Sequence, residues 1–466
     1  MTYTCSVCED SYTEVIKATG NHTYTEEVIP ATPDAQGYTK HTCTVCGDTY
    51  NDTYVDYVPE GPTTTPVESF TYEVVGDTVK ITGFIGAEKV IIIPAEIEGK
   101  PVTEIGYRAF YTKRTITSVT LPATLTKVGD QAFRGCTALA EVNFNEGLKT
   151  IGTYSFGATK IAKFVAPSTL ETIGVSAVNG CTSLSDMDLK NVKSIKGTAF
   201  AGCTKLGTTA AGTRIVIPAT VTEVAAGAFQ NCTGFTRVDW YPVRLTAGAA
   251  GNKDNPAFQG CTSITLARIY QTAEYIPSYL FYKAADAANR KGITTLSFMS
   301  GSVAKEIGDY AFYQHRFAAV TFPETVTKIG RESFRNINAL RTINFGTGVK
   351  SVGQQAFSNC NNLASVTIPG NVETLYAYAF RDCAALETVV IEEGMNYISS
   401  YAFTGTALKS ITLPASITKI NSGLTYGTSA EIKYYEGTYV DKYLHSAAAK
   451  IKNETLTSLG EFVPAE

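Results

Sequence analysis

Four cysteines near the N-terminus have the types and spacing best suited to chemistry in this sequence. They form two C-x-x-C pairs, Cys5 with Cys8 and Cys43 with Cys46, and the second pair repeats the surroundings of the first 38 residues later. Two such pairs are a common way to present four thiolates to a tetrahedral zinc ion. The pairs therefore point to a structural zinc site, with disulfides within the pairs or free thiols as the open alternatives. No other cofactor is expected.

The remaining candidates for catalysis are few, because the chain has only four histidines. His22 and His41 belong to the cysteine modules, where either could complete a zinc site that uses one pair. His315 takes the place of a repeated cysteine, and His445 lies in the expected C-terminal cap. The sequence has no G-x-S-x-G, H-E-x-x-H, P-loop or G-x-G-x-x-G motif. We therefore predict no catalytic residue and no enzyme activity.

Composition and charge exclude several kinds of partner. The chain carries 39 basic and 43 acidic residues and a net charge of -4, without a run of Lys or Arg. This balance gives no electrostatic support for binding nucleic acid or an anionic membrane. No stretch reaches the roughly 18 apolar residues that a membrane span needs. The low charged fraction of 18% and the many hydroxyl side chains favour an exported protein, although no export signal is present in this chain.

A phenylalanine, usually preceded by alanine, returns at nearly constant spacing through most of the chain. Most steps are 22 or 23 residues, and three steps of 29, 29 and 31 residues carry insertions. Repetition at this period is typical of solenoids. The thirteen positions are Phe110, Phe133, Phe156, Val178, Phe200, Phe229, Phe258, Phe281, Phe312, Phe334, Phe357, Phe380 and Phe403.

Each unit also contains the pattern L-x-x-V-x-I, which alternates apolar and polar residues and predicts a short strand buried on one face. Proline often follows, as at Pro122 and Pro369, and ends the strand because it has no amide hydrogen. The rest of the unit must return as a turn, a second short extended piece or a helical turn. Since one unit cannot bury its apolar side alone, we predict a repeat solenoid. It is mainly β, with a continuous, curved parallel sheet on one side and short turns or helical turns on the back.

The predicted solenoid needs a cap at each end, because its terminal strands would otherwise be exposed edges. A hairpin around Gly76-Asp77 is expected at the start. At the other end, Glu431–Tyr435 is expected to be the last strand, covered by an amphipathic helix over Thr438–Ile451. The predicted modules are two small C-x-x-C modules at 1–60, the first truncated, a linker at 61–68, an N-terminal cap at 69–100, thirteen repeats at 101–422 and a C-terminal cap at 423–466.

These repeats resemble the BspA-like class of leucine-rich repeats, which occurs mainly in surface proteins of gut and oral bacteria. The resemblance runs from about Phe70 to the C-terminus and is carried by stretches such as Ile105–Phe110 and Leu363–Pro369. It implies a secreted or cell-surface location and adhesion, as a monomer, to a host extracellular-matrix or surface protein or to a glycan. The alternative is a passive spacer that presents other domains of a longer surface protein.

Seven further cysteines lie three residues after the repeated phenylalanine or its valine substitute. Their regular position predicts a small, slightly apolar slot in each coil, since free cysteine is among the most readily buried residues. An odd number of copies, and Thr, Ala, His or Ile at the same position in other units, argue for packing and against disulfides. The residues are Cys136, Cys181, Cys203, Cys232, Cys261, Cys360 and Cys383.

The outward positions of the predicted strands suggest where a ligand binds. They are uniform and small from Leu296 onward, but mixed charges and aromatic residues gather over residues 186–270, beside the three insertions. Aromatic residues and arginine are the types that interfaces favour. The alternative is that Trp240 belongs to the core and the charges only solvate the surface. The predicted ligand-binding residues are Asp186, Asp188, Arg214, Arg237, Asp239, Tyr241, Arg244, Arg268 and Tyr270.

Overall fold

The structure is a computed structural model, and it divides the chain into two compact units, residues 1–63 and residues 64–466. It describes residues 2–4, 11–13, 23–32, 35–45, 47–55, 64–209, 212–246, 251–282, 284, 291–450 and 452–464.

The N-terminal unit consists of antiparallel strands. Strands β1 (Thr2–Thr4) and β2 (Ser11–Thr13) form one pair, and β3 (Tyr24–Ile29), β4 (Gly37–Cys43) and β5 (Thr49–Val55) form a three-stranded sheet. The Cys43 side chain is buried at the end of β4.

The predicted zinc site falls mostly outside this description. Cys5, Cys8 and Cys46 lie outside the described residues, as does His22. His41 is buried in β4, with its Nε2 atom 2.9 Å from an Asp52 carboxylate oxygen. The zinc site therefore stays a prediction.

The second unit starts with the hairpin that the sequence predicts. After a short 3-10 helix, η1 (Val67–Ser69), strands β6 (Phe70–Val75) and β7 (Thr78–Phe84) pair in antiparallel fashion. Gly76 adopts a positive φ of 60° in the turn between them, a conformation that glycine adopts without strain. Strand β7 then pairs in parallel with β10 (Lys100–Ile105), which β9 (Glu96–Ile97) joins in antiparallel fashion.

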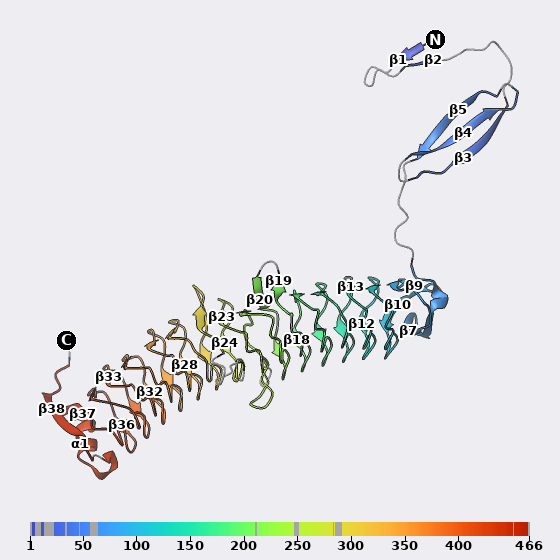
Figure 1. Ribbon diagram of the computed structural model, residues 1–466. Coiled ribbons are helices and arrows are strands. Elements are labelled where there is room, and N and C mark those ends of the chain that lie inside the picture. Colours follow the sequence, from blue (N-terminus) through green and yellow to red (C-terminus); the bar gives the residue numbers. More distant parts are fainter. Residues whose placement is uncertain are drawn as a thin grey trace. The chain divides into compact units, whose positions relative to one another are not determined.

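One side of the coils carries the strands that the L-x-x-V-x-I pattern predicts, here named the front ladder (Figure 1). Where adjacent front strands pair, they are parallel and in register, so like residues lie on like. The front strands are β8 (Val90–Ile92), β11 (Ser118–Thr120), β13 (Glu141–Asn143), β15 (Lys163–Val165), β17 (Asp186–Asp188), β20 (Gly212–Ile217), β22 (Arg237–Trp240), β23 (Leu266–Ile269), β25 (Thr295–Phe298), β27 (Ala319–Thr321), β29 (Thr342–Asn344), β31 (Ser365–Ile368), β33 (Thr388–Ile391), β35 (Ser410–Thr412) and β37 (Glu431–Glu436).

The prediction of one continuous sheet was wrong. Within the described residues, the front ladder is divided into separate sheets, with breaks between β13 and β15, β17 and β20, β25 and β27, and β29 and β31. At the second break the strand β19 (Thr208–Thr209) pairs with β20 in antiparallel fashion, because residues inserted there form a small hairpin.

A second ladder of two-residue strands, the rear ladder, is the second extended piece that the repeat length allows. It is also parallel and in register, and within the described residues it forms two runs. Its strands are β12 (Lys127–Val128), β14 (Thr150–Ile151), β16 (Thr172–Ile173), β18 (Ser194–Ile195), β21 (Glu223–Val224), β24 (Tyr275–Ile276), β26 (Glu306–Ile307), β28 (Lys328–Ile329), β30 (Ser351–Val352), β32 (Thr374–Leu375), β34 (Tyr397–Ile398) and β36 (Lys419–Ile420).

The turn that recurs around each repeated phenylalanine forms a third set of contacts between coils, which the sequence did not predict. In the second unit Gln131 and Gly135, two residues before and after Phe133, have φ angles of 57° and 75°. Phe133 N–H donates a hydrogen bond to the Ser155 carbonyl oxygen of the next coil at 2.7 Å. A left-handed conformation is unfavourable for a residue such as glutamine. These inter-coil hydrogen bonds offset that cost.

The repeated phenylalanines stack in one aromatic spine, as the sequence predicts. All thirteen positions are fully buried. Successive rings lie 4.6 Å apart between Phe110 and Phe133 and 5.7 Å apart between Phe380 and Phe403. Where Val178 interrupts the spine, the ring of Phe164 from the front ladder lies 5.8 Å from that of Phe200 and fills the space.

The seven repeated cysteines do more than fill a slot. Each thiol lies within hydrogen-bonding distance of the main-chain oxygen of the spine residue one coil earlier; for Cys261 the partner is Phe229 oxygen at 2.9 Å. The thiol is a second donor to this buried oxygen, which in the case of Phe229 also accepts a hydrogen bond from Cys232 N–H at 3.1 Å. Burial raises the pKa of the Cys136 and Cys261 thiols to about 12, so both remain protonated donors at neutral pH.

His315 performs the same task where the cysteine is missing. Its Nε2 atom lies 3.1 Å from the Phe281 carbonyl oxygen, and its Nδ1 atom accepts a hydrogen bond from Ile293 N–H at 3.1 Å. This pair of contacts requires a neutral ring with its hydrogen on Nε2. Burial accordingly lowers the pKa of His315 to about 4.

The C-terminal cap differs from its prediction in two respects. A helix begins where it was predicted, and the Thr438 side chain accepts a hydrogen bond from Asp441 N–H at its start, but α1 (Tyr439–Leu444) is shorter than the predicted Thr438–Ile451. It is followed by a separate 3-10 helix, η2 (Ala447–Ala449). However, β37 is not the last strand: β38 (Thr455–Glu461) pairs with it in parallel, because the chain turns back beyond the helix and continues the front ladder.

Candidate binding surface

Strands β20, β22 and β23 bring the charged residues of the predicted binding face together. Side chains alternate along a strand, and in β22 Val238 and Trp240 point into the core and are fully buried. Arg237 and Asp239 take the intervening positions. The register places Arg214 of β20 beside Arg237, and Arg268 of β23 beside Asp239. Arg214, Arg237, Asp239 and Arg268 are named the arginine cluster below.

Asp239 is the centre of this cluster, and only 1% of it is exposed. Its Oδ2 atom lies 3.1 Å from an Arg237 nitrogen and 3.6 Å from an Arg214 nitrogen. A buried carboxylate requires such partners, because it loses its hydration. Among the described residues, neither its other oxygen, Oδ1, nor the Nε atom of Arg237 has a hydrogen-bond partner.

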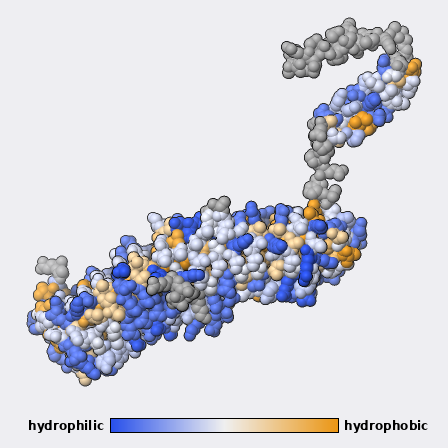
Figure 2. All heavy atoms as spheres, viewed as in Figure 1, coloured by the Kyte–Doolittle hydropathy of each residue, from blue (hydrophilic) through white to orange (hydrophobic). Residues whose placement is uncertain are grey.

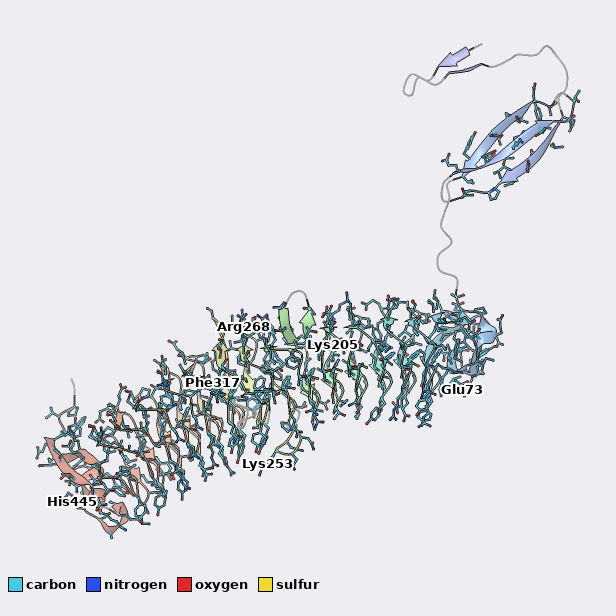
Figure 3. All side chains as sticks on the ribbon, viewed as in Figure 1. Glu73, Lys205, Lys253, Arg268, Phe317 and His445 are labelled. Carbon is cyan, nitrogen blue, oxygen red and sulfur yellow. The ribbon has the colours of Figure 1, made fainter. Side chains whose placement is uncertain are left out.

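Arg268 differs from the other two arginines of the cluster. It is half-buried and lies at an outward position of β23. Figure 3 shows it on the side of the coils that carries the front ladder. Within the described part of the chain, its guanidinium group forms no hydrogen bond or ion pair. Its five N–H donors therefore have no acceptor among the described residues.

Two tyrosines lie next to the cluster, immediately after β22 and β23. The rings of Tyr241 and Tyr270 stack with centroids 4.0 Å apart and an interplanar angle of 18°. Burial and the hydrogen bond with the Tyr270 hydroxyl raise the pKa of Tyr241 to about 12. The Tyr241 hydroxyl is therefore neutral at physiological pH and can both donate and accept hydrogen bonds.

Three of the predicted binding residues are not joined to the cluster by strand pairing or contact. Asp186 and Asp188 lie on β17, which pairs with β15 in a separate two-stranded sheet. The Arg244 Cζ atom lies 5.5 Å from the ring centre of Tyr275, and Tyr275 belongs to the rear strand β24. That these residues contact a ligand stays a prediction.

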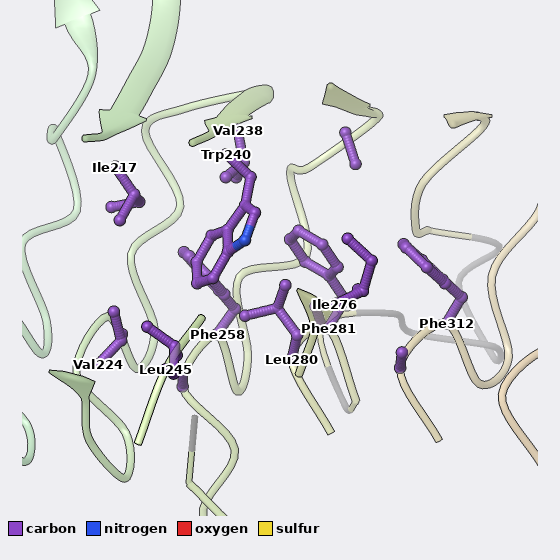
Figure 4. Packing of buried hydrophobic residues seen from close by; sticks show 14 of the residues in the cluster. Ile217, Val224, Val238, Trp240, Leu245, Phe258, Ile276, Leu280, Phe281 and Phe312 are labelled. Atoms are coloured by element: carbon purple, nitrogen blue, oxygen red, sulfur yellow. The ribbon is translucent and has the colours of Figure 1, made fainter. Parts of the chain in front are cut away.

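Trp240 is a core residue rather than a surface one. Figure 4 shows its indole among Ile217, Phe258 and Leu280, and none of it is exposed. The alternative interpretation of this residue from the sequence is therefore confirmed. Its indole N–H has no hydrogen-bond partner among the described residues.

The insertions do not all lie beside the cluster. Figure 3 shows Lys205, which precedes the β19–β20 hairpin, on the same side as Arg268, and Lys253 of the second insertion on the opposite side. Residues 210–211, 247–250, 283 and 285–290 lie outside the described residues, including most of the third insertion. Of the described insertion residues, those around β19 and Tyr241, which begins the second insertion and stacks on Tyr270, are therefore candidates to extend the cluster.

Two surface grooves lie elsewhere, and sequence reasoning missed both. A groove of about 880 Å³ lies between β13 and β15, and one of about 750 Å³ lies between β25 and β27. Each coincides with a break in the front ladder. Phe144 and Phe298 are partly exposed there, but Phe322 and Phe345 take the same repeat position and are buried. No sequence signal therefore separates these coils from their neighbours.

The structure offers neither a metal centre nor a membrane span in its described residues. No group of three or more His, Cys, Asp or Glu side chains there is arranged to hold a metal ion. No helix in the described part of the chain is long and apolar enough to cross a membrane. Figure 2 shows polar residues interspersed with small apolar groups over the visible face.

The coils thus define a solenoid of parallel strands with a charged and aromatic surface patch. The family model described as the BspA type leucine rich repeat region (6 copies) matches residues 103–236, 209–297 and 305–430. Because these matches cover more than half of the sequence, the chain belongs to the BspA type leucine-rich repeat family. No curated protein gives a significant match.

Solved structures of bacterial leucine-rich repeat proteins are similar to the chain. One from Bacteroides ovatus is 17% identical, with a TM-score of 0.46, and the match covers 85% of this chain and 99% of that one. A leucine rich cell surface protein from Faecalibacterium prausnitzii is 20% identical, with a TM-score of 0.32, covering 85% and 100%. The pneumococcal vaccine antigen PcpA is 17% identical, with a TM-score of 0.40, covering 85% and 98%.

Proposed function

We propose that this chain is a non-enzymatic binding segment of a secreted or surface-attached bacterial protein, and that it acts as a monomer. Its ligand is a host extracellular-matrix or surface protein or a glycan, bound through the arginine cluster and the stacked Tyr241 and Tyr270. Membership of the BspA type family and the weakly charged, hydroxyl-rich composition support this location and role.

The observation that carries the proposal is the unpaired guanidinium group of Arg268 beside the buried Asp239. Two guanidinium groups contact one carboxylate and the register places a third arginine beside it, so the cluster carries an excess of positive charge on a chain whose net charge is -4. The ion pairs from Asp239 hold Arg237 and Arg214 in place, which reduces the entropy lost when a ligand binds. An arginine fork recognises carboxylate or sulfate groups in a bidentate manner. The cluster is therefore suited to a ligand that carries such a group.

The test is to screen the chain against matrix-protein and glycan arrays and then to compare variants. Replacing Arg237, Asp239 and Arg268 together with alanine is expected to abolish binding, a loss of about 100-fold or more, since buried hot-spot residues each contribute about 2 kcal/mol or more. Binding by the unaltered chain should also weaken as salt rises. Affinity is measured by biolayer interferometry.

A matched control removes the same charges elsewhere. Lys350, Glu387 and Lys409 include the exposed Lys409–Glu387 ion pair, and their triple alanine variant should bind normally. Trp240 is the only tryptophan and lies beneath the cluster, so its fluorescence reports whether the strands remain folded. Unchanged affinity in the cluster variant would refute the proposed surface. Failure of the unaltered chain to bind any probe would favour the passive spacer.

A further inference from the structure

Two stacked tyrosines lie where the chain leaves the front strands β22 and β23. The strands β20, β22, β23 and β25 pair consecutively and in register. The residues that follow them, Pro218, Tyr241, Tyr270 and Met299, therefore take equivalent positions in consecutive coils. Tyr270 N–H donates to the Trp240 carbonyl oxygen at 3.0 Å, which fixes the main chains of the two tyrosines side by side. In this column each of the two tyrosines has one phenol neighbour, the other tyrosine.

The rings of Tyr241 and Tyr270 face each other in an orientation that suits a bond between them. Their centroids lie 4.0 Å apart, with an interplanar angle of 18°. A hydrogen bond between the two hydroxyl groups points both rings the same way, so the carbon atoms ortho to the two oxygens lie next to each other. A tyrosyl radical carries much of its unpaired electron at these carbons, in orbitals perpendicular to the ring. Both side chains are partly exposed, so an oxidant in solution can withdraw electrons from them.

The other parallel tyrosine pairs in the described coils lack this arrangement. The ring centroids of Tyr279 and Tyr310 lie 5.1 Å apart, and the Tyr310 hydroxyl donates to a glutamate oxygen at 2.6 Å. The centroids of Tyr378 and Tyr401 lie 5.6 Å apart, and the Tyr401 hydroxyl accepts a hydrogen bond from the Lys450 ammonium group at 2.6 Å. In each of these pairs another residue holds a hydroxyl group, and the rings are farther apart. Among these pairs, close contact between ortho carbons is therefore expected for the first one only.

The Tyr241–Tyr270 pair lies beside an interruption of the rear ladder. Within the described residues, no strand joins β21 to β24, so the coil that contains β22 contributes no strand to this ladder. It is joined to the next coil by the pairing of β22 with β23 and by the spine, where the ring centroids of Phe258 and Phe281 lie 5.3 Å apart. A covalent bond between the two tyrosines would stabilise this junction at the end of the front strands.

We propose that Tyr241 and Tyr270 form a site of oxidative crosslinking, at which a haem peroxidase with hydrogen peroxide joins them as dityrosine. Each phenol gives up one electron and its hydroxyl proton, and together these reduce one hydrogen peroxide molecule to two water molecules. The two radicals form a carbon–carbon bond between their ortho carbons. The hydrogens on these carbons then move to the oxygens, which restores both hydroxyl groups. No ligand takes part, so this site does not depend on the proposed function.

Treatment of the full chain with a haem peroxidase and limiting hydrogen peroxide tests the proposal. The fluorescence of dityrosine should appear, and mass spectrometry should find the peptide that contains Tyr241 joined to the one that contains Tyr270, with the loss of two hydrogen atoms. Because the reacting atoms are held together, the yield per chain should not depend on chain concentration. After oxidation, the amides of residues 237–240 and 266–269 should exchange their hydrogens more slowly, since the bond opposes local opening of β22 and β23.

A pair of matched variants separates this site from the other tyrosines. Tyr241→Phe keeps the stacked ring but removes the hydroxyl that is oxidised. It should lower the yield of dityrosine within one chain by about tenfold or more, because the other pairs lack the geometry that makes an intramolecular reaction fast. Tyr378→Phe removes one member of a wider pair and should leave the bond between Tyr241 and Tyr270 unchanged. Circular dichroism before oxidation checks that both variants are folded.

Several results would overturn the proposal. The first is an oxidised chain without a bond between Tyr241 and Tyr270. The second is a yield that rises in proportion to chain concentration, which would mean that dityrosine forms between two chains. The third is an equal loss of dityrosine in the Tyr241→Phe and Tyr378→Phe variants, which would mean that the close stacking does not select the site. Unchanged amide exchange in the crosslinked chain would remove the stabilising role of the bond.

Discussion

Replacing Phe357 with alanine is expected to lower the free energy of unfolding by about 4 kcal/mol, since burying a phenylalanine in a packed core contributes about 3–5 kcal/mol. The ring is fully buried. It stacks on Phe334 at 5.3 Å and on Phe380 at 5.4 Å, and Phe345 approaches its edge at 5.9 Å. The cavity would thus interrupt contacts with both neighbouring coils.

Urea unfolding followed by circular dichroism measures this effect, and Tyr376→Ala is the control. Tyr376 belongs to the same part of the chain, but 47% of it is exposed, so its loss should change stability by less than about 1 kcal/mol. Equal effects of the two substitutions would mean that the aromatic spine is not the main contributor to the stability of packing between coils.

Replacing His315 with cysteine is expected to change how stability depends on pH. The neutral ring is required in the folded state, and burial lowers the pKa of His315 to about 4, whereas an unfolded histidine titrates near pH 6.5, about 2.5 units higher. The unfolded chain therefore binds a proton in this window that the folded chain does not. Stability should fall as pH decreases from about 6.5 to 4, by up to about 3 kcal/mol at this site.

Cysteine at position 315 would restore the residue that seven other coils use, and its thiol does not titrate in this range. Exchange of the Ile293 amide hydrogen measures the effect locally, because this amide donates to His315 Nδ1. Asp and Glu side chains also titrate in this pH range. Because both proteins contain the same carboxylates, their contributions to the pH dependence of stability cancel in the comparison. Parallel pH profiles for the two chains would show that His315 is not held neutral by the fold.

The repeat period made most of the fold predictable from sequence. Positions such as Phe133 and Phe357 recur because stacking coils place like residues on like, and the strand pattern follows from burial of alternate residues. The cysteine position was also predictable as buried. Its hydrogen bond was not, because the acceptor is a main-chain oxygen of the previous coil, as for Cys261 and Phe229.

Other features depend on how neighbouring coils fit together, which the pattern of one unit does not record. The left-handed residues beside the spine, such as Gln131, include residue types with no preference for that conformation. The breaks at β13–β15 and β25–β27 have no distinctive residues. The strand β38 follows a segment in which the expected helix was the last recognisable pattern, so the continuation of the ladder beyond it was missed.

The candidate site was predictable only in part. The strand register brings Arg214, Arg237, Asp239 and Arg268 together because they take the outward positions that alternation assigns to them. Asp186 and Asp188 take equivalent outward positions in the sequence pattern, but their strand β17 does not pair with β20, so they lie in a different sheet from the cluster. The burial of Asp239 could not be predicted, because it depends on the side chains that cover it from adjacent strands.

Arginine footprinting tests the proposed binding surface most directly. Phenylglyoxal modifies accessible guanidinium groups, and mass spectrometry would locate the modified arginines with and without a ligand identified on the arrays. The account predicts that the ligand protects Arg268, Arg237 and Arg214, while the exposed Arg341 reacts to the same extent in both samples. Protection confined to other arginines, with Arg268 still fully reactive in the complex, would contradict it.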